Sequence, residues 1–272
     1  MNNLINMVNG FTIFGLEIKF YGIIIALGML LGIIVATKNT KFRNLKADDI
    51  YTLALYVLPL AIIGARLYFV AFYDYDYTFW EIFDIKSGGL AIYGGVIGGA
   101  AGALLFCLIH KKKFLNISDV AVISLILGQG IGRWGNFFNQ EAYGYEVTNK
   151  ALQWFPYAVY IEAENTWHMA TFFYESFFNL IIFAVLMILI RKISKPGIIT
   201  SLYFVLYGLV RVIVEGLRTD SLYIGATGIR VSQLLSAVLV VGGIIAIIFI
   251  ILYDKWKELQ PSKTDKSKGP KR

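Results

Sequence analysis

The residues of this chain that are best suited to chemistry lie between positions 132 and 144. The stretch reads GRWGNFFNQEAYG and places Arg133, Asn136, Asn139 and Glu141 directly after the apolar run 120–130. An arginine inside the hydrocarbon costs about 2.5–3.5 kcal/mol on insertion scales, so an arginine retained there usually meets an anion, a cavity or a carboxylate. The stretch is therefore a candidate active site.

The composition predicts an all-α polytopic membrane protein. Of the 272 residues, 57% are hydrophobic and only 16% are charged, which is far from the composition of a soluble globular domain. The net charge of +7 would suit nucleic acid, but the basic residues form short clusters between apolar runs, as they do in cytoplasmic loops. We therefore expect no nucleic-acid partner.

Seven segments are long and apolar enough to span a bilayer, whose hydrocarbon core of about 30 Å requires about 20 residues of helix. They cover residues 16–36, 50–72, 89–109, 117–134, 171–190, 198–217 and 231–253. The first segment lacks the basic flank and the cleavage site of a signal peptide, so we expect it to remain as a span.

Lysine and arginine accumulate in alternate connections, at 38–46, 111–113 and 191–195, and again in the tail. This distribution predicts an N-terminus outside the cell and a cytoplasmic C-terminus, because basic loops stay on the cytoplasmic side. The remaining connections carry few cations and many acidic residues, among them Asp74, Asp76, Glu81, Asp84, Glu146, Glu162 and Glu164.

The predicted organisation is a seven-helix catalytic domain at 1–253 and a basic cytoplasmic tail at 254–272. The tail is too polar to bury a core, so we expect it to be disordered. The connection 136–168 is rich in aromatic residues, which favour a small extracytoplasmic cap that rests on lipid headgroups.

Glycines at 94, 95, 98 and 99 recur one helical turn apart in the third predicted span. This spacing favours close helix packing through small residues. The alternative is a glycine-lined face that admits a lipid headgroup or a peptide.

The other predicted spans also contain polar groups. Arg211 and Glu215 are four residues apart, so they share one helical face and could pair. If the helices form a bundle, these groups converge with Arg133 and Glu141 at one depth. The other polar groups in the predicted spans are Tyr21, Arg66, Glu175 and Arg218, and Arg218 lies further out on the same helix as Arg211.

Clustered guanidinium groups suit a phosphate, because the planar fork makes bidentate, charge-assisted hydrogen bonds with phosphate oxygens. In a bilayer the abundant phosphates are phospholipid headgroups, so two functions compete: an enzyme acting on a phospholipid, and a transporter or scramblase. A transporter more naturally shows broken helices in corresponding positions of two halves. Polar residues at the outer ends of spans favour the interfacial enzyme.

The stretch 132–144 closely resembles the signature of the bacterial prolipoprotein diacylglyceryl transferases. The resemblance extends over nearly all seven predicted spans. It includes Phe20-Tyr21-Gly22, Gly64-Ala65-Arg66, the glycine-rich stretch 88–95, Tyr174-Glu175-Ser176, Tyr207-Gly208, the run 211–221 and Arg230-Val231-Ser232-Gln233.

The resemblance implies transfer of the sn-1,2-diacylglyceryl group from phosphatidylglycerol to the lipobox cysteine of a preprolipoprotein, with release of glycerol phosphate. This is the first step of lipoprotein maturation in the bacterial cytoplasmic membrane. The implied partners are phosphatidylglycerol, the preprolipoprotein signal peptide and membrane lipids. The resemblance implies no cofactor and no metal, and the two histidines, His110 and His168, are too few for a metal site.

Such a reaction needs cations to stabilise the departing phosphate and a deprotonated thiol, whose pKa is ordinarily about 8.5. We expect Arg133 and Arg211 to form the phosphate clamp. The resemblance places Arg133, Asn136 and Glu141 in the phosphatidylglycerol site, with Glu215 orienting Arg211. The other predicted substrate-binding residues are Tyr21, Asn139, Gly144, Arg66 and Arg218, of which the two arginines could instead be topological anchors.

Many members of the resembled family carry histidine where this chain has Tyr93. A tyrosine, with a pKa of about 10, is a poor base at neutral pH. Tyr93 remains a catalytic candidate with two alternatives. Either Tyr93 only donates a hydrogen bond, or the arginine field and a carboxylate such as Glu141 activate the thiol. We favour the second. His168 lies one residue away from the family pattern, and we assign it no role.

The single cysteine, Cys107, lies in an apolar stretch, where cysteine usually behaves as a small hydrophobe. We predict that Cys107→Ser leaves lipidation of a lipobox peptide nearly unchanged, because the attacking sulfur belongs to the peptide. Complete loss of transfer in that assay would instead require a covalent intermediate on this chain.

Overall fold

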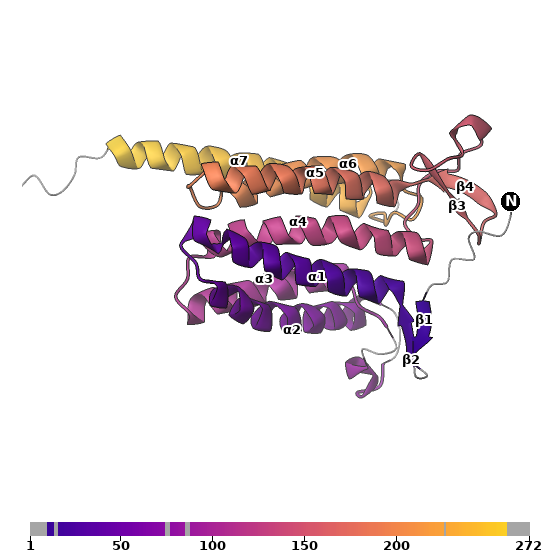
Figure 1. Cartoon of the computed structure of the whole chain (residues 1–272), viewed down its shortest axis with the longest axis horizontal. Helices are drawn as coiled ribbons and strands as arrows, with labels where there is room; N and C mark the ends of the chain where they lie inside the picture. Colours follow the sequence, from indigo (N-terminus) through magenta and orange to yellow (C-terminus); the bar gives the residue numbers. More distant parts are fainter. Residues whose placement is uncertain (1–9, 14–15, 74–76, 85–87, 226, 260–272) are drawn as a thin grey trace, which may run out of the picture.

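Seven long helices form the protein in the computed structural model, which describes residues 10–13, 16–73, 77–84, 88–225 and 227–259 (Figure 1). Each helix is long and apolar enough to cross a membrane, so the predicted seven-span, all-α architecture is confirmed. The helices are α1 Phe20–Asn39, α2 Ala47–Phe72, α3 Ile92–Ile109, α4 Phe114–Asn139, α5 Thr171–Lys192, α6 Ile198–Leu217 and α7 Val231–Leu259.

Three helix boundaries differ most from the hydropathy pattern. Residues 16–19, expected in the first span, form strand β2 (Leu16–Lys19), which pairs antiparallel with β1 (Gly10–Ile13). Helix α4 runs on to Asn139, and α7 continues to Leu259, beyond the expected boundary at 253. Hydropathy marks where hydrocarbon ends, whereas a helix ends where its hydrogen-bonding ladder stops. Residues 260–272, Asp74 and Asp76 lie outside the described residues.

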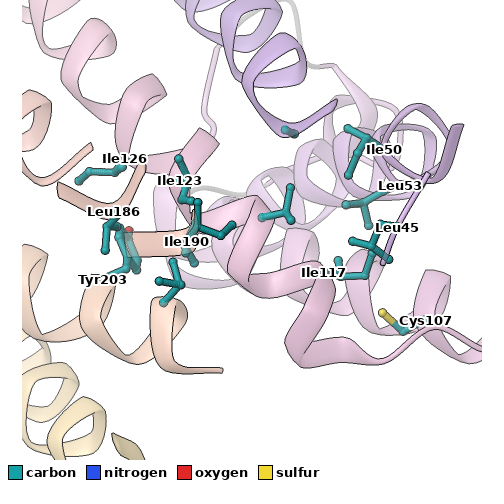
Figure 2. Close-up of a cluster of buried hydrophobic side chains, with 14 of the residues drawn as sticks. Leu45, Ile50, Leu53, Cys107, Ile117, Ile123, Ile126, Leu186, Ile190 and Tyr203 are labelled. Atoms are coloured by element: carbon teal, nitrogen blue, oxygen red, sulfur yellow. The ribbon is translucent and has the colours of Figure 1, made fainter. Parts of the chain in front are cut away.

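Helix α4 lies between two groups of helices, with α1, α2 and α3 on one side and α5, α6 and α7 on the other (Figure 1). Its side chains Ile117, Ile123 and Ile126 are fully buried. Figure 2 shows Ile123 and Ile126 beside Leu186 and Ile190 of α5. Burial of apolar surface around α4 thus joins the two groups.

The glycines of α3 serve close packing, as their spacing predicts. A Cβ at Gly94 would collide with the carbonyl oxygen of Gly64 in α2, and a Cβ at Gly98 would collide with that of Leu60. A Cβ at Gly102 would lie 2.8 Å from the Tyr56 carbonyl oxygen. Small residues let the two helix backbones approach this closely, so this face is filled by α2.

A second antiparallel hairpin, β3 (Ala158–Ile161) with β4 (Thr166–Met169), lies in the connection between α4 and α5 where a cap was predicted, and we call it the cap. Both hairpins lie at one end of the bundle, and α7 extends beyond the opposite end (Figure 1). Three short 3-10 helices, Thr40–Arg43, Glu81–Phe83 and Lys150–Leu152, lie in connections. The assignment of the hairpin end to the cell exterior stays a prediction from the basic loops.

A buried ion pair lies at the end of the bundle opposite the cap and joins α4 to its neighbours. Arg43 donates from Nε to Oδ2 of Asp119 in α4 at 2.8 Å, with both side chains almost fully buried. The same carboxylate accepts from the backbone N–H groups of Gly197 and Thr200 and from the Thr200 hydroxyl. It therefore satisfies donors at the N-terminus of α6 that the helix itself leaves free.

We predict that Asp119→Ala destabilises the protein by about 3–5 kcal/mol, because it leaves a buried arginine without its counter-ion. Asp254→Ala is the matched control: its partner Lys195 and Asp254 itself are 45% and 36% exposed, so the loss should be about 0–1 kcal/mol. Thermal unfolding in detergent measures both variants. Equal shifts for the two would contradict a stabilising role for the Asp119 network.

Candidate active site

Four helix ends meet beneath the cap, and each supplies part of the candidate site. Helix α4 brings Arg133, Asn136 and Asn139 in its last turns, because the helix continues through the motif instead of ending before it. Gln140 then takes a left-handed conformation at φ 50°, which ends the helix and turns the chain toward Glu141. The first turns of α1 and α5 and the last turns of α6 supply the other groups.

The centre of the site is the carboxylate of Glu175 in α5, which contacts both arginines of the predicted clamp. Its Oε1 lies 2.6 Å from Arg133 Nη2, and its Oε2 lies 2.8 Å from Arg211 Nη1. The predicted convergence of Arg133 and Arg211 from separate helices is therefore confirmed. Glu175 itself is 1% exposed, which makes it the most deeply buried member of the trio.

The pairing predicted from the spacing of Arg211 and Glu215 is also present. Arg211 Nη2 lies 2.7 Å from Glu215 Oε2. That oxygen has no aligned hydrogen-bond donor among the described residues, so the contact acts through charge. Arg211 thus lies between two carboxylates.

Glu175 is the site residue that the sequence-based assignment missed. It was recognised as a polar group within a span, but it was not placed in the site. The available signal was a carboxylate in the second turn of a strongly apolar helix. Such a group needs a partner, but the carboxylates assigned to Arg133 and Arg211 were Glu141 and Glu215.

The amide side chains of α4 hold the other predicted carboxylate. Asn136 donates to Glu141 Oε1 at 2.8 Å, and Asn139 donates to the same oxygen at 3.3 Å. Asn136 Oδ1 also lies 3.4 Å from Arg133 Nη1. One asparagine therefore connects Glu141 to the arginine pair.

Tyr21 of α1 lies against the same turns of α4. A Cβ at Gly135 would come within 2.6 Å of Tyr21 Cδ2, so only glycine lets the ring approach this closely. Tyr21 is within electrostatic range of both Glu141 and Arg133. The structure thus brings Tyr21 into the predicted site.

Gly144 positions the cap rather than offering a side chain. Its N–H donates to the Met169 carbonyl at 2.9 Å, and its carbonyl lies 2.9 Å from Nδ1 of His168. His168 is buried and also contacts Thr166 and Glu164. His168 therefore has a structural role in the cap, which the sequence-based assignment did not foresee.

Arg218 follows the last turn of α6 and makes two hydrogen bonds to Asp220, at 2.9 and 2.6 Å. Partial burial opposes ionisation of Asp220, but these bonds lower the pKa of its carboxyl. The Arg218 backbone bridges to that of Gly144. Arg218 thus lies where α6 meets the cap.

Two further predicted residues lie in other contacts. Arg66 of α2 is buried and donates to the backbone carbonyls of the α2–α3 connection, contributed by Glu81, Ile82, Gly88 and Gly89. Tyr93 of α3 contacts Ser232 of α7, with 3.3 Å between the hydroxyl oxygens. Within the described part of the chain, no hydrogen bond or ion pair joins either residue to Glu175.

A pocket of about 430 Å³ opens between the cap and the end of α6. Glu141 lies on its wall, whereas Arg133, Asn136 and Arg211 are not among the lining residues. A second wall residue, Tyr143, donates to Glu164, and this bond together with burial raises the pKa of Tyr143 to about 12. The other lining residues are Gln140, Ala142, Glu164, Thr219 and Asp220.

Two guanidinium groups held by one carboxylate are suited to binding an oxyanion. The Arg133 and Arg211 side chains are 20% and 13% exposed, whereas Glu175 is covered. Part of each arginine side chain therefore remains accessible, and a guanidinium group can make charge-assisted hydrogen bonds to an oxyanion. Among the residues that the structure describes, no three His, Cys, Asp or Glu side chains are grouped to hold a metal ion.

Comparison with known proteins assigns the family. The family model for prolipoprotein diacylglyceryl transferase matches residues 9–249. The chain belongs to the prolipoprotein diacylglyceryl transferase family. The match covers all of the helices that supply the site.

Similar proteins share most of their length with this chain. The phosphatidylglycerol--prolipoprotein diacylglyceryl transferase 1 of Clostridium perfringens is 43% identical over 91% of this chain and 95% of its own length. The phosphatidylglycerol--prolipoprotein diacylglyceryl transferase of Finegoldia magna is 46% identical over 86% and 92%. That of Clostridium botulinum strain Hall is 45% identical over 88% and 94%.

We predict that Gly144→Ala loosens the cap of this family member. An added Cβ would lie 2.8 Å from the Leu217 carbonyl oxygen and 2.9 Å from both Met169 Cβ and Thr171 Cγ2, and such overpacking costs about 1–3 kcal/mol. Amide exchange in residues 144–147 and 166–169 should accelerate roughly tenfold. Gly128→Ala is the control, since its Cβ would meet nothing within 4 Å. Unchanged exchange in the Gly144 variant would contradict this role.

Proposed function

We propose that this chain transfers the sn-1,2-diacylglyceryl group of phosphatidylglycerol to the thiol of a lipobox cysteine in a preprolipoprotein. The observation that carries the proposal is the meeting of Arg133 and Arg211 on Glu175, in a member of the diacylglyceryl transferase family. The names of its relatives indicate the donor and the acceptor. The arginine pair supplies a place for the phosphate.

The reaction breaks one bond and forms one. The peptide sulfur attacks the sn-3 carbon of the diacylglyceryl group, and the carbon–oxygen bond to phosphate breaks. The phosphate oxygen keeps the bonding electron pair and leaves as glycerol phosphate, while the thiol proton passes to a base. Arg133 and Arg211 stabilise the charge that grows on the departing phosphate, a contribution of several kcal/mol for well-placed donors.

We assign thiol activation to the arginine field and Glu141 rather than to Tyr93. Glu141 borders the pocket under the cap and is connected to Arg133 through Asn136. Tyr93 contacts Ser232 and belongs to the α2–α3 pair. A positive field favours the thiolate form of a cysteine, and a nearby carboxylate can accept its proton.

The seven helices and the bacterial family support a multi-pass membrane protein. We place it in the bacterial cytoplasmic membrane with the cap outside, where the secreted preprolipoprotein exposes its lipobox. Asn139 acts through its hydrogen bond to Glu141, and Gly144 acts by positioning the cap. Arg66 and Arg218 stay candidate substrate contacts, and their backbone and Asp220 partners favour an anchoring role.

The direct test incubates the purified protein with phosphatidylglycerol vesicles and a lipobox peptide. Mass spectrometry should detect a peptide carrying a diacylglyceryl adduct, together with released glycerol phosphate. A phospholipid transporter or scramblase would instead move lipid between leaflets and leave both molecules covalently unchanged. That outcome would replace the proposal.

We predict that Arg133→Ala and Arg211→Ala each lower transfer by about 10²–10³-fold, which is the usual loss when one group that stabilises developing charge is removed. Arg191→Ala is the matched control: Arg191 is an exposed residue at the opposite end of α5, so its loss should leave transfer unchanged. Membrane insertion is followed in parallel. Near-normal transfer by either site variant would rule out the clamp.

A further inference from the structure

The two clamp arginines already hold a protein anion. Each Glu175 oxygen contacts a different arginine, at 2.6 Å for Arg133 and 2.8 Å for Arg211. The carboxylate comes from α5, whereas the arginines come from α4 and α6. Glu175 therefore fixes the separation and orientation of the two guanidinium groups across three helices.

The charges of this cluster balance without any ligand. Arg133 and Arg211 contribute two positive charges, and Glu175 and Glu215 contribute two negative charges. Glu141 adds a further carboxylate one step away, through Asn136. A ligand phosphate thus approaches a site without net positive charge, not a bare pair of cations.

This balance matters because the two phosphates of the proposed reaction differ in charge. The phosphodiester headgroup carries one negative charge, whereas a phosphomonoester carries about −1.5 to −2 at pH 7. Coulomb attraction grows with ligand charge, so an uncompensated arginine pair would hold the released product more tightly than the lipid. A fixed carboxylate repels the product more than the lipid and reduces that difference.

The difference in burial between the arginines and Glu175 determines which groups a ligand can contact. The arginine side chains are 20% and 13% exposed, and Glu175 is 1% exposed. A ligand can therefore reach part of each arginine side chain, whereas the Glu175 carboxylate is covered. Glu175 is in this sense a positioning residue, because it acts on the ligand through the arginines and through its charge.

We infer that Glu175 is a built-in counter-anion that orients the two arginines and sets the selectivity of the site for a phosphodiester headgroup over a phosphomonoester product. The inference rests on the proposed function, and no sequence-based assignment includes it. The consequence is easier product release, because the carboxylate weakens the binding of glycerol phosphate to the wild-type site.

The test compares Glu175→Gln with the wild-type protein in the vesicle assay. The amide keeps the shape and removes one negative charge. We expect the inhibition constant of added glycerol phosphate to fall roughly tenfold, an effect of one charge at short range, while KM for phosphatidylglycerol changes less and kcat falls. Glu175→Asp keeps the charge, so its ratio of inhibition constant to KM should stay near the wild-type value.

Two further variants make the result specific. Glu162→Gln removes one negative charge from the exposed cap and should leave the inhibition constant unchanged. Glu215→Gln removes the second carboxylate that faces Arg211 and should shift the constant in the same direction as Glu175→Gln. It also covers the case in which the Glu175 variant does not fold. An unchanged or raised inhibition constant in the folded glutamine variants would overturn the inference.

Direct binding separates this inference from the proposed function. Radiolabelled glycerol phosphate is titrated into each purified variant without peptide or lipid, so the comparison does not need turnover. Tighter binding to Glu175→Gln supports the counter-anion even if no adduct forms. Equal or weaker binding, in a preparation whose wild-type form does transfer lipid, overturns the inference and leaves the proposed function standing.

Discussion

The bridge from Glu175 to Arg133 and Arg211 is the interaction on which the site depends. Three helices meet at one carboxylate, so the position of each guanidinium is set by the other two partners. Removing one member of a buried ion pair usually costs about 3–5 kcal/mol, because a charge is left without compensation. The same contacts that hold the helix ends together also keep two partly accessible cations on one carboxylate.

Helix α4 makes this bridge possible because it is fastened to α6 near both of its ends. At one end Asp119 accepts from the backbone at the start of α6, and at the other end Arg133 reaches Arg211 through Glu175. Between these contacts, Ile123 and Ile126 of α4 pack in the core (Figure 2). Apolar burial thus sets the distance between the helices, and the two polar contacts set their register.

Sequence patterns predicted the seven spans, the Arg211–Glu215 pair and the convergence of the two arginines, because hydropathy and helical spacing are local properties. Glu175 was not placed in the site, since its partners lie 42 and 36 residues away in sequence and no local pattern connects them. The β1–β2 hairpin was missed for a related reason: Leu16, Glu17, Ile18 and Lys19 alternate apolar and charged side chains next to an apolar run, and their pairing with β1 is not a local property. The contacts of Arg66 depend on where a connecting loop folds back, which hydropathy does not encode.

The most direct measurement of the central claim is a double-mutant cycle for phosphatidylglycerol transfer with Arg133→Lys and Arg211→Lys. Both substitutions keep the charge and remove the planar fork. If the two guanidinium groups share Glu175 and grip one phosphate, the double variant should be little worse than the poorer single variant, because coupled residues are not additive. Losses that simply multiply would show that the two arginines act independently, and this would contradict the account.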